Sequence, residues 1–256
     1  MNFEVEGRKA FAYTAAHELD PKKPALVFVH GAGLDHSSFG LQSRYFGYHG
    51  WNVLAVDLPG HGRSEGPPLP AISAMADWIF KIVKASRFSM VGHSMGSLVA
   101  LECAARQPER VERIALVGTA YPMKVGEEFL DAARRNHQDA FDMHTIWGHA
   151  AQAPLGRDPS PGMWMYGDTL ARLARLAPGV LYNDLKACNE FVFSGPVTCP
   201  ALLILGKLDV MTPPRNARIL QEQLPQSRTV VVAGSGHSLM VEAPDETLDA
   251  LAGFLA

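Results

Sequence analysis

Six short segments of the chain consist almost entirely of apolar residues, many of them β-branched. They are ALVFVH (25–30), NVLAVD (52–57), FSMVGH (88–93), RIALVG (113–118), ALLILG (201–206) and RTVVVAG (228–234). Continuous apolar runs of this length are typical of strands that are buried on both faces of a parallel sheet. The opening segment alternates polar and apolar residues instead, which predicts an antiparallel hairpin that turns at residues 6–8.

Patterns of helical period separate these apolar segments. We expect helices over about 71–87, 95–106, 213–224 and 244–255. Prolines stand where two of these helices begin, a position that tolerates proline well. Alternation of strands and helices implies right-handed crossovers. The predicted fold class is therefore α/β, with a mostly parallel central sheet that is covered by helices on both faces.

Residues 121–198 interrupt this alternation, because they contain no apolar run of the buried-strand type. They contain two helical stretches, GEEFLDAARRNH and TLARLARLA, and the turn-rich piece LGRDPSPGMW. We interpret 121–198 as a helical insertion between two strands of the sheet. The sheet domain is then formed by 1–120 together with 199–256.

Residues with reactive side chains follow the predicted strands directly. Ser94 comes after 88–93, and Asp209 and His237 follow the last two strands. Ligand sites of such sheets lie at the carboxyl ends of the strands, so we expect these side chains to meet at one edge. Ser94 stands in the segment GHSMG, with glycines two positions away on either side. Glycine removes Cβ atoms where a backbone turns sharply, which suits a nucleophile that must stand clear of the chain.

The sequence resembles the α/β-hydrolase family over nearly its whole length. The segment 92–96 matches the nucleophile elbow G-x-S-x-G, and serine, acid and histidine come in the order that this fold uses. Three further segments are similar to the family: HGAG at 30–33, DLPGHGRS at 57–64, and GSGH at 234–237 followed by a helix that starts with proline. The resemblance implies a lid formed by 121–198 over the active site.

The resemblance also implies the catalytic roles of individual residues. Ser94 would be the nucleophile and His237 the base that takes its proton and returns it to the leaving group. Asp209 would fix the imidazole tautomer and stabilise the imidazolium. The oxyanion would be bound by the backbone N–H groups of Met95 and Ala32. Because a base must be deprotonated to accept a proton, we expect activity to fall in acid.

Each of these residues also has a structural alternative. Ser94 could be a turn residue, and His237 could belong to an ordinary loop. Asp209 could form a turn or cap the following helix, with Glu242 and Asp245 as alternative acids that lie after the histidine. Structural roles are expected for His30, Asp57 and His93.

The substrate pocket is expected between the lid and the sheet. Candidate lining residues are Leu34, Tyr121, Met123, Trp147, Trp164 and Met240. Apolar spacing alone does not separate a pocket from a core, so these side chains could instead pack the lid onto the sheet domain. The expected substrate is a small to medium, partly apolar ester, thioester or lactone.

Other functions of the same scaffold remain open at this point. They are a C–C bond hydrolase, a lyase, a cofactor-free perhydrolase, and a ligand-binding protein without enzyme activity. A serine at the elbow, where dehalogenases and epoxide hydrolases of the family carry aspartate, disfavours those two activities. Gly33 stands where several perhydrolases have proline, which also disfavours that reaction.

Composition restricts the partners and the compartment. The 256 residues are 47% hydrophobic and 19% charged, with a net charge of −3, which gives no reason to expect nucleic acid or membrane partners. Three cysteines without ligand-like spacing argue against a disulfide framework and a structural zinc site.

No metal or organic cofactor is implied. The N-terminus lacks the features of a signal peptide, so we expect a cytoplasmic protein. The sequence does not indicate the oligomeric state.

Overall fold

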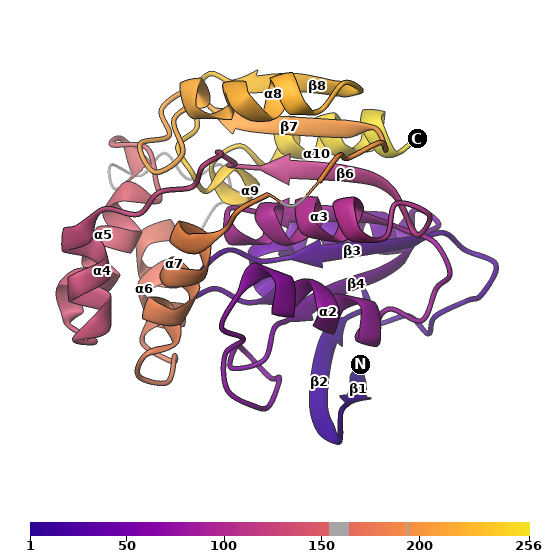
Figure 1. Cartoon of the computed structure of the whole chain (residues 1–256), viewed down its shortest axis with the longest axis horizontal. Coiled ribbons are helices and arrows are strands. Elements are labelled where there is room, and N and C mark those ends of the chain that lie inside the picture. Colours follow the sequence, from indigo (N-terminus) through magenta and orange to yellow (C-terminus); the bar gives the residue numbers. More distant parts are fainter. Residues whose placement is uncertain (154–163, 194) are drawn as a thin grey trace.

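A single mixed sheet organises the computed structural model, which describes residues 1–153, 164–193 and 195–256. Within them, eight strands lie in the order β1-β2-β4-β3-β5-β6-β7-β8 (Figure 1). Their bounds are β1 Asn2–Val5, β2 Arg8–Tyr13, β3 Ala25–Val29, β4 Asn52–Asp57, β5 Phe88–His93, β6 Val111–Val117, β7 Ala201–Gly206 and β8 Ser227–Val232. Pairing is antiparallel from β1 through β2 to β4 and parallel elsewhere. The predicted fold class is confirmed.

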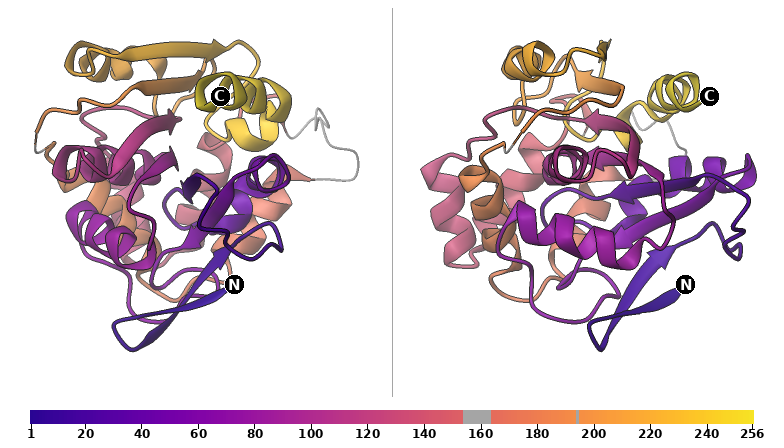
Figure 2. Two further views of the ribbon diagram at one scale, coloured as in Figure 1. Left: turned by 90° about the vertical axis from the view of Figure 1, so that its right-hand side faces the viewer. Right: turned by 45° about the vertical axis from the view of Figure 1, so that its right-hand side comes forward.

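The sheet is covered by helices on both faces, as the views in Figure 2 show. One face packs against α2 (Ile72–Ile82), α3 (Met95–Arg106) and α8 (Arg218–Gln223), and the other against α1 (Gly40–Tyr48), α9 (Leu239–Glu242) and α10 (Pro244–Leu255). Alternate residues of one strand therefore enter different cores. In β3, Val27 belongs to the first core and Phe28 to the second. This double burial explains why the central strands are continuously apolar. β8 lies at the edge of the sheet and most of its residues are half-buried or exposed, so the expected burial on both faces is wrong for this strand.

Two helices differ from their predicted bounds. Helix α2 ends at Ile82, five residues before the predicted end, because the chain turns extended at Val83. The guanidinium of Arg110 donates to the carbonyl groups of Val83 and Ala85, which fixes this turn. The segment predicted as one helix at 213–224 starts with a 3-10 turn (Pro214–Ala217) before α8.

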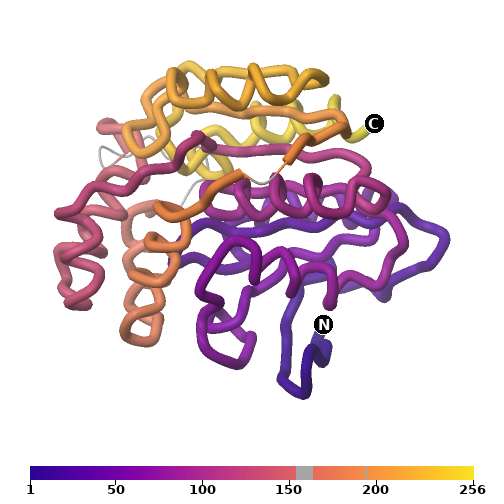
Figure 3. Tube along the Cα trace, viewed as in Figure 1, coloured from indigo at the N-terminus to yellow at the C-terminus, as the bar shows by residue number. Residues whose placement is uncertain are grey.

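Among the described residues between β6 and β7, four α-helices lie at the carboxyl end of the parallel strands (Figure 1), and Figure 3 traces the chain through them and back to the sheet. We call α4 (Glu127–Arg134), α5 (Gln138–Trp147), α6 (Met165–Leu173) and α7 (Val180–Glu190) the cap helices. The first predicted helical stretch contains α4, and the second, TLARLARLA, overlaps the C-terminal half of α6 but extends past its end at Leu173, whereas α5 and α7 were not predicted. Most of the turn-rich piece at 155–164 lies outside the described residues.

The division into a sheet domain and a 121–198 insertion stays a prediction. In the part of the chain that the structure describes, no helix combines the length and the apolar character needed to cross a membrane.

Candidate active site

Ser94 lies at a sharp turn between β5 and α3. Its backbone has φ 51° and ψ −116°, a conformation that side-chain-bearing residues rarely adopt. Positions 92 and 96 accept only glycine, because a Cβ atom at either position would overlap the backbone. A Cβ on Gly92 would lie 2.1 Å from the carbonyl oxygen of Gly96, and a Cβ on Gly96 would lie 2.2 Å from that of Val29. The tight turn places Ser94 on the wall of a cavity next to the strand ends.

Asp209 and His237 follow β7 and β8 and are brought together across the sheet edge. The Nδ1 atom of His237 lies 2.8 Å from Oδ2 of Asp209, and both side chains are buried. The Asp209 carboxylate also accepts hydrogen bonds from the backbone N–H groups of Met211 and Thr212, at 2.8 Å each. Since a carboxylate only accepts, Nδ1 of His237 is the protonated nitrogen and Nε2 carries the lone pair.

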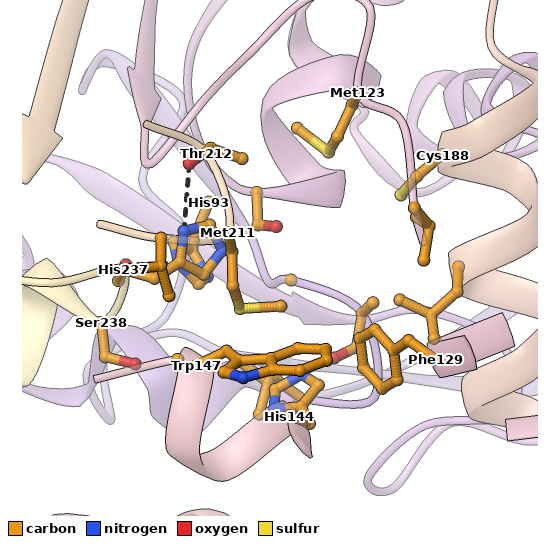
Figure 4. A pocket seen from close by; sticks show the side chains of 18 of the residues that line it. His93, Met123, Phe129, His144, Trp147, Cys188, Met211, Thr212, His237 and Ser238 are labelled. Carbon is orange, nitrogen blue, oxygen red and sulfur yellow. Dashed lines mark hydrogen bonds between the residues drawn. The ribbon is translucent and has the colours of Figure 1, made fainter. Parts of the chain in front are cut away.

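Thr212 is a further member of this group that the sequence interpretation missed. Its hydroxyl donates to Oδ2 of Asp209 at 2.7 Å and lies 3.1 Å from Nδ1 of His237 (Figure 4). Burial alone would raise the pKa of Asp209, but the charge and hydrogen bond of His237 and the hydrogen bonds of Thr212 hold it below its usual value. Asp209 is therefore a charged acceptor. The only sequence signal for Thr212 is its place three residues after an aspartate, a common turn arrangement.

The loop at 30–33 packs directly against the elbow. A Cβ on Gly31 would lie 2.8 Å from Nδ1 of His93 and 3.3 Å from Cβ of Ser94. Ala32 lines the same cavity as Ser94. Met95 is the first residue of α3, so its N–H group has no acceptor within the helix, and its side chain is buried in the core. The structure thus brings both predicted oxyanion residues close to Ser94.

Two buried histidines, His30 and His93, hold these loops by hydrogen bonds to backbone groups. Nδ1 of His30 lies 2.8 Å from the carbonyl oxygen of Gly31, while Nε2 accepts from the N–H of Leu58. Nε2 of His93 donates to the carbonyl oxygen of His237 at 3.0 Å. Burial lowers the pKa of His30 to about 4 and that of His93 well below its usual value. Both rings are neutral, and their contacts fit the expected structural roles.

Asp57 also has the contacts expected of a structural residue. It accepts hydrogen bonds from the N–H and Nδ1 of His36 and from the N–H of Arg63, each at 2.8 Å. Asp35, His36 and Asp57 lie close enough to hold a cation. Asp35 accepts from the backbone of Ser37 at 2.8 Å, so both carboxylates are already used within the loop. The cluster therefore has a structural role, which is to hold this loop together.

Glu242, considered above as an alternative acid, holds the histidine loop instead. Its carboxylate accepts from the backbone N–H groups of Gly236 and Ser238, on either side of His237, at 3.1 Å each. It also accepts from the N–H of Ala150, which follows cap helix α5, at 2.8 Å. Glu242 therefore ties the loop that carries His237 to the cap.

A cavity of about 220 Å³ lies between the cap helices and the strand ends. Leu34, Met123 and Trp147 line it, as predicted. Figure 4 shows Trp147, Phe129 and His144 on one side of it and His93 and His237 at one end. Further lining residues include Thr169, Leu185, Cys188, Val210, Met211 and Ser238. Most of this wall is apolar.

Three predicted pocket residues lie elsewhere. Tyr121 lines a separate pocket with Ile219, and its hydroxyl accepts from the N–H of Phe193. Trp164 is 65% exposed and does not line the cavity. Met240 is buried in the core between the sheet and α10. Tyr121 and Trp164 were predicted from their place in the insertion and Met240 from its closeness to His237, but neither feature determines the direction of a side chain.

Comparison with known proteins agrees with this geometry. The sequence profile described as "Alpha/beta hydrolase family" matches residues 26–250. A pimeloyl-(acyl-carrier protein) methyl ester esterase of Chromobacterium violaceum is 29% identical, over 91% of this chain and 94% of that protein. A hydrolase of (E)-2-((N-methylformamido)methylene)succinate from Acinetobacter baylyi is 22% identical, over 90% of this chain and 89% of its own.

A solved structure shares the fold over the full length. The enol-lactonase of Burkholderia xenovorans LB400 superimposes with a TM-score of 0.88 at 22% identity, covering 100% of this chain and 99% of that chain. The relatives agree with the predicted enzyme class, a hydrolase acting on ester bonds. The profile match covers most of the chain and includes the elbow, the acid and the histidine. The chain belongs to the alpha/beta hydrolase family.

Proposed function

We propose that this protein is a serine hydrolase that cleaves a small, partly apolar ester or lactone through an acyl-enzyme on Ser94. One observation carries the proposal: Ser94, in its strained turn, lines the same cavity as His237, whose Nδ1 is hydrogen-bonded to a charged Asp209. A serine hydroxyl is a weak nucleophile and needs such a base. The relatives include a methyl ester esterase, and its name supports the same class of enzyme.

The first half of the reaction forms the acyl-enzyme. Nε2 of His237 takes the proton from the Ser94 hydroxyl while the oxygen attacks the substrate carbonyl carbon. The resulting imidazolium donates its Nε2 proton to the leaving alkoxide as the ester bond breaks. Asp209, held by two backbone N–H groups and Thr212, keeps the ring oriented and offsets its charge.

The negative charge of the tetrahedral intermediate falls on the former carbonyl oxygen. The N–H groups of Met95 and Ala32 are the proposed donors to it, and the N-terminal end of α3 adds a favourable dipole. In the second half, water replaces the alcohol: His237 removes its proton, hydroxide attacks the acyl carbon, and Ser94 leaves with its proton restored.

The cavity supports a small acyl group. Its volume of about 220 Å³ lies below the roughly 300–1,000 Å³ typical of sites for drug-sized ligands. One charged side chain among the described lining residues, Lys124, donates its Nζ to the carbonyl oxygen of Asn189 at 2.9 Å. The other described side chains of this lining carry no fixed charge, which favours an uncharged acyl chain.

The direct test is hydrolysis of p-nitrophenyl esters with acyl chains of two to eight carbons, and of matched lactones, by wild type and Ser94→Ala. We expect wild type to prefer short chains and Ser94→Ala to lose at least about 1,000-fold in kcat/KM. Equal rates for the two proteins would refute the acyl-enzyme on Ser94. Turnover of long chains only would refute the proposed substrate size.

A further inference from the structure

The peptide group between Ala32 and Gly33 is held on both sides by side chains of the cap. Its carbonyl oxygen, on Ala32, accepts a hydrogen bond from Nε2 of His144 in α5 at 3.0 Å. Its N–H, on Gly33, donates to Oδ2 of Asp184 in α7 at 2.9 Å. This peptide directly follows the N–H of Ala32, which the proposed function assigns to the oxyanion.

His144 keeps one defined protonation state in this position. It is buried, and burial lowers its pKa to about 4, so the ring is neutral. Because a carbonyl oxygen accepts from Nε2, that nitrogen carries the proton and Nδ1 carries the lone pair. Nδ1 is buried and has no hydrogen-bond partner among the described residues. A buried polar atom without a partner is destabilising, and an aromatic hydrocarbon at this position would avoid that cost.

Asp184 is held in place by His61, which belongs to the segment DLPGHGRS. Nε2 of His61 lies 2.8 Å from Oδ2 of Asp184, and Nδ1 lies 3.1 Å from the carbonyl oxygen of Pro59. Both partners are acceptors, so both ring nitrogens of His61 donate and the ring is an imidazolium. Burial opposes this charge, but the carboxylate of Asp184 raises the pKa of His61. Asp184 therefore meets Gly33 as a fixed, charged acceptor.

Gly33 itself cannot adjust easily to a change in the cap. Its φ of +68° is in the left-handed region, and a Cβ would lie 2.9 Å from the side chain of Leu173 in α6. The conformation of this peptide is thus set by α5, α6 and α7 together. An oxyanion donor is effective only when its N–H points at the developing charge, and a misplacement of about 1 Å can cost 100-fold.

We propose that His144 and Asp184 are positioning residues that orient the N–H of Ala32 for oxyanion binding, so that the cap completes the oxyanion hole. This inference rests on the proposed function. Neither side chain is required to touch the reacting atoms. Each acts through the Ala32–Gly33 peptide, one on its carbonyl oxygen and one on its N–H.

The test replaces His144 by Phe, which keeps the ring and removes the donor, and by Gln, whose Nε2 offers an N–H at a similar reach. The control is Thr145→Val, because the Thr145 hydroxyl is buried in the same helix and, among the described residues, donates to the carbonyl oxygen of Phe141. His144→Leu serves if His144→Phe does not fold. The measurements are kcat and KM for a p-nitrophenyl ester and the Kd of a trifluoromethyl ketone that forms a tetrahedral adduct.

We expect His144→Phe to lower kcat about 10- to 100-fold with KM changed less than threefold, and to weaken the ketone in parallel. His144→Gln should recover most of the loss, and Thr145→Val should stay within twofold of wild type. The inference is overturned if His144→Phe keeps its kcat, or if Thr145→Val loses as much. If either of these results is found and Ser94→Ala is inactive, the proposed function still stands. If Ser94→Ala is active, the proposed function fails, and the inference that rests on it loses its basis.

Discussion

At the residue scale, the charge on Asp209 decides whether His237 presents the correct nitrogen to Ser94. The carboxylate accepts from Nδ1 of His237, from the Thr212 hydroxyl and from two backbone N–H groups. These donors hold the pKa of Asp209 below its usual value against the effect of burial. An acceptor of this strength excludes the tautomer in which Nε2 carries the proton.

Asp209→Asn should remove activity with little change in structure. The amide can turn its NH₂ group toward Nδ1, which favours the tautomer that cannot take the Ser94 proton. We expect kcat to fall by about 10³- to 10⁴-fold with KM nearly unchanged, measured by steady-state ester hydrolysis. A loss smaller than tenfold would mean that another acid orients His237, and Glu242 would be the first to examine.

At the element scale, the buried pair of Asp184 and His61 joins helix α7 to the loop after β4. Both side chains are fully buried, and they lie 2.8 Å apart. Removing one partner of a buried ion pair leaves an uncompensated charge, which typically costs about 3–5 kcal/mol. The pair is therefore a main attachment of the cap.

Asp184→Ala should lower the free energy of unfolding by about 3–5 kcal/mol, measured by urea denaturation. Lys186→Ala is the matched control, because Lys186 and Glu190 form an exposed pair on the same helix. Its expected cost is about 0.3–0.5 kcal/mol. Similar losses in the two variants would show that the buried pair contributes no more than an exposed one.

The same pair gives the stability of the protein a defined pH dependence. The pKa of His61 is raised in the folded state, so its contribution is complete below the unfolded imidazole value of about 6.5 and is lost as pH rises through the folded value. The pKa of Asp184 is lowered, so its contribution is complete above about 3.9 and is lost as pH falls through the folded value. The pair is thus complete between about pH 4 and 6.5.

We therefore expect the difference in unfolding free energy between wild type and His61→Leu to shrink from pH 6 to pH 9. Urea denaturation of both proteins at these two pH values measures it, and the subtraction removes the titration of other groups. A difference that stays constant or grows with pH would contradict a protonated His61.

The central strands of the sheet could be predicted because each is buried in a regular way. β3, β5 and β7 enter two cores on alternate residues, which requires apolar side chains at every position. Helix α5 was missed because it mixes Asp139, Asp142 and His144 with apolar residues. His144 faces the cavity and the Ala32 carbonyl oxygen rather than a core, so the helix has no continuous apolar stripe.

At the scale of the whole molecule, the cap is bonded to the sheet domain at several separate places. Besides the contacts of His144 and Asp184, Glu242 bonds Ala150, Arg172 bonds Ser38 and Asn183 bonds the carbonyl oxygen of Leu69. These bonds reach the oxyanion loop, the histidine loop and the loops after β3 and β4. A cap with such attachments should not open independently of the catalytic loops.

We expect the cap and the sheet domain to unfold in one transition. Trp147 and Trp164 lie in or beside the cap helices, whereas Trp51 and Trp78 lie in the sheet domain. Thermal unfolding of Trp51→Phe/Trp78→Phe and of Trp147→Phe/Trp164→Phe by fluorescence therefore reports the two regions separately, with far-ultraviolet circular dichroism as reference. A cap signal that melts more than a few degrees before circular dichroism would contradict a single unit.

The catalytic group of the candidate site could be predicted because strand ends carry it. Ser94 follows β5 directly, and Asp209 and His237 stand three and five residues after the ends of β7 and β8, so the strand ends bring the three side chains to one edge of the sheet. Asp184 lies far from any motif, and its role arises only when α7 packs against Gly33. Tyr121 shows the opposite case, since a residue just after β6 turns into a separate pocket.

The most direct test of the central claim is the mass of the protein after reaction with a fluorophosphonate, with peptide mapping of the adduct. Ser94 should be the one modified residue in wild type, and Ser94→Ala should remain unmodified under the same conditions. An unmodified wild type, or an adduct that persists in Ser94→Ala, would contradict the assignment of Ser94 as the nucleophile.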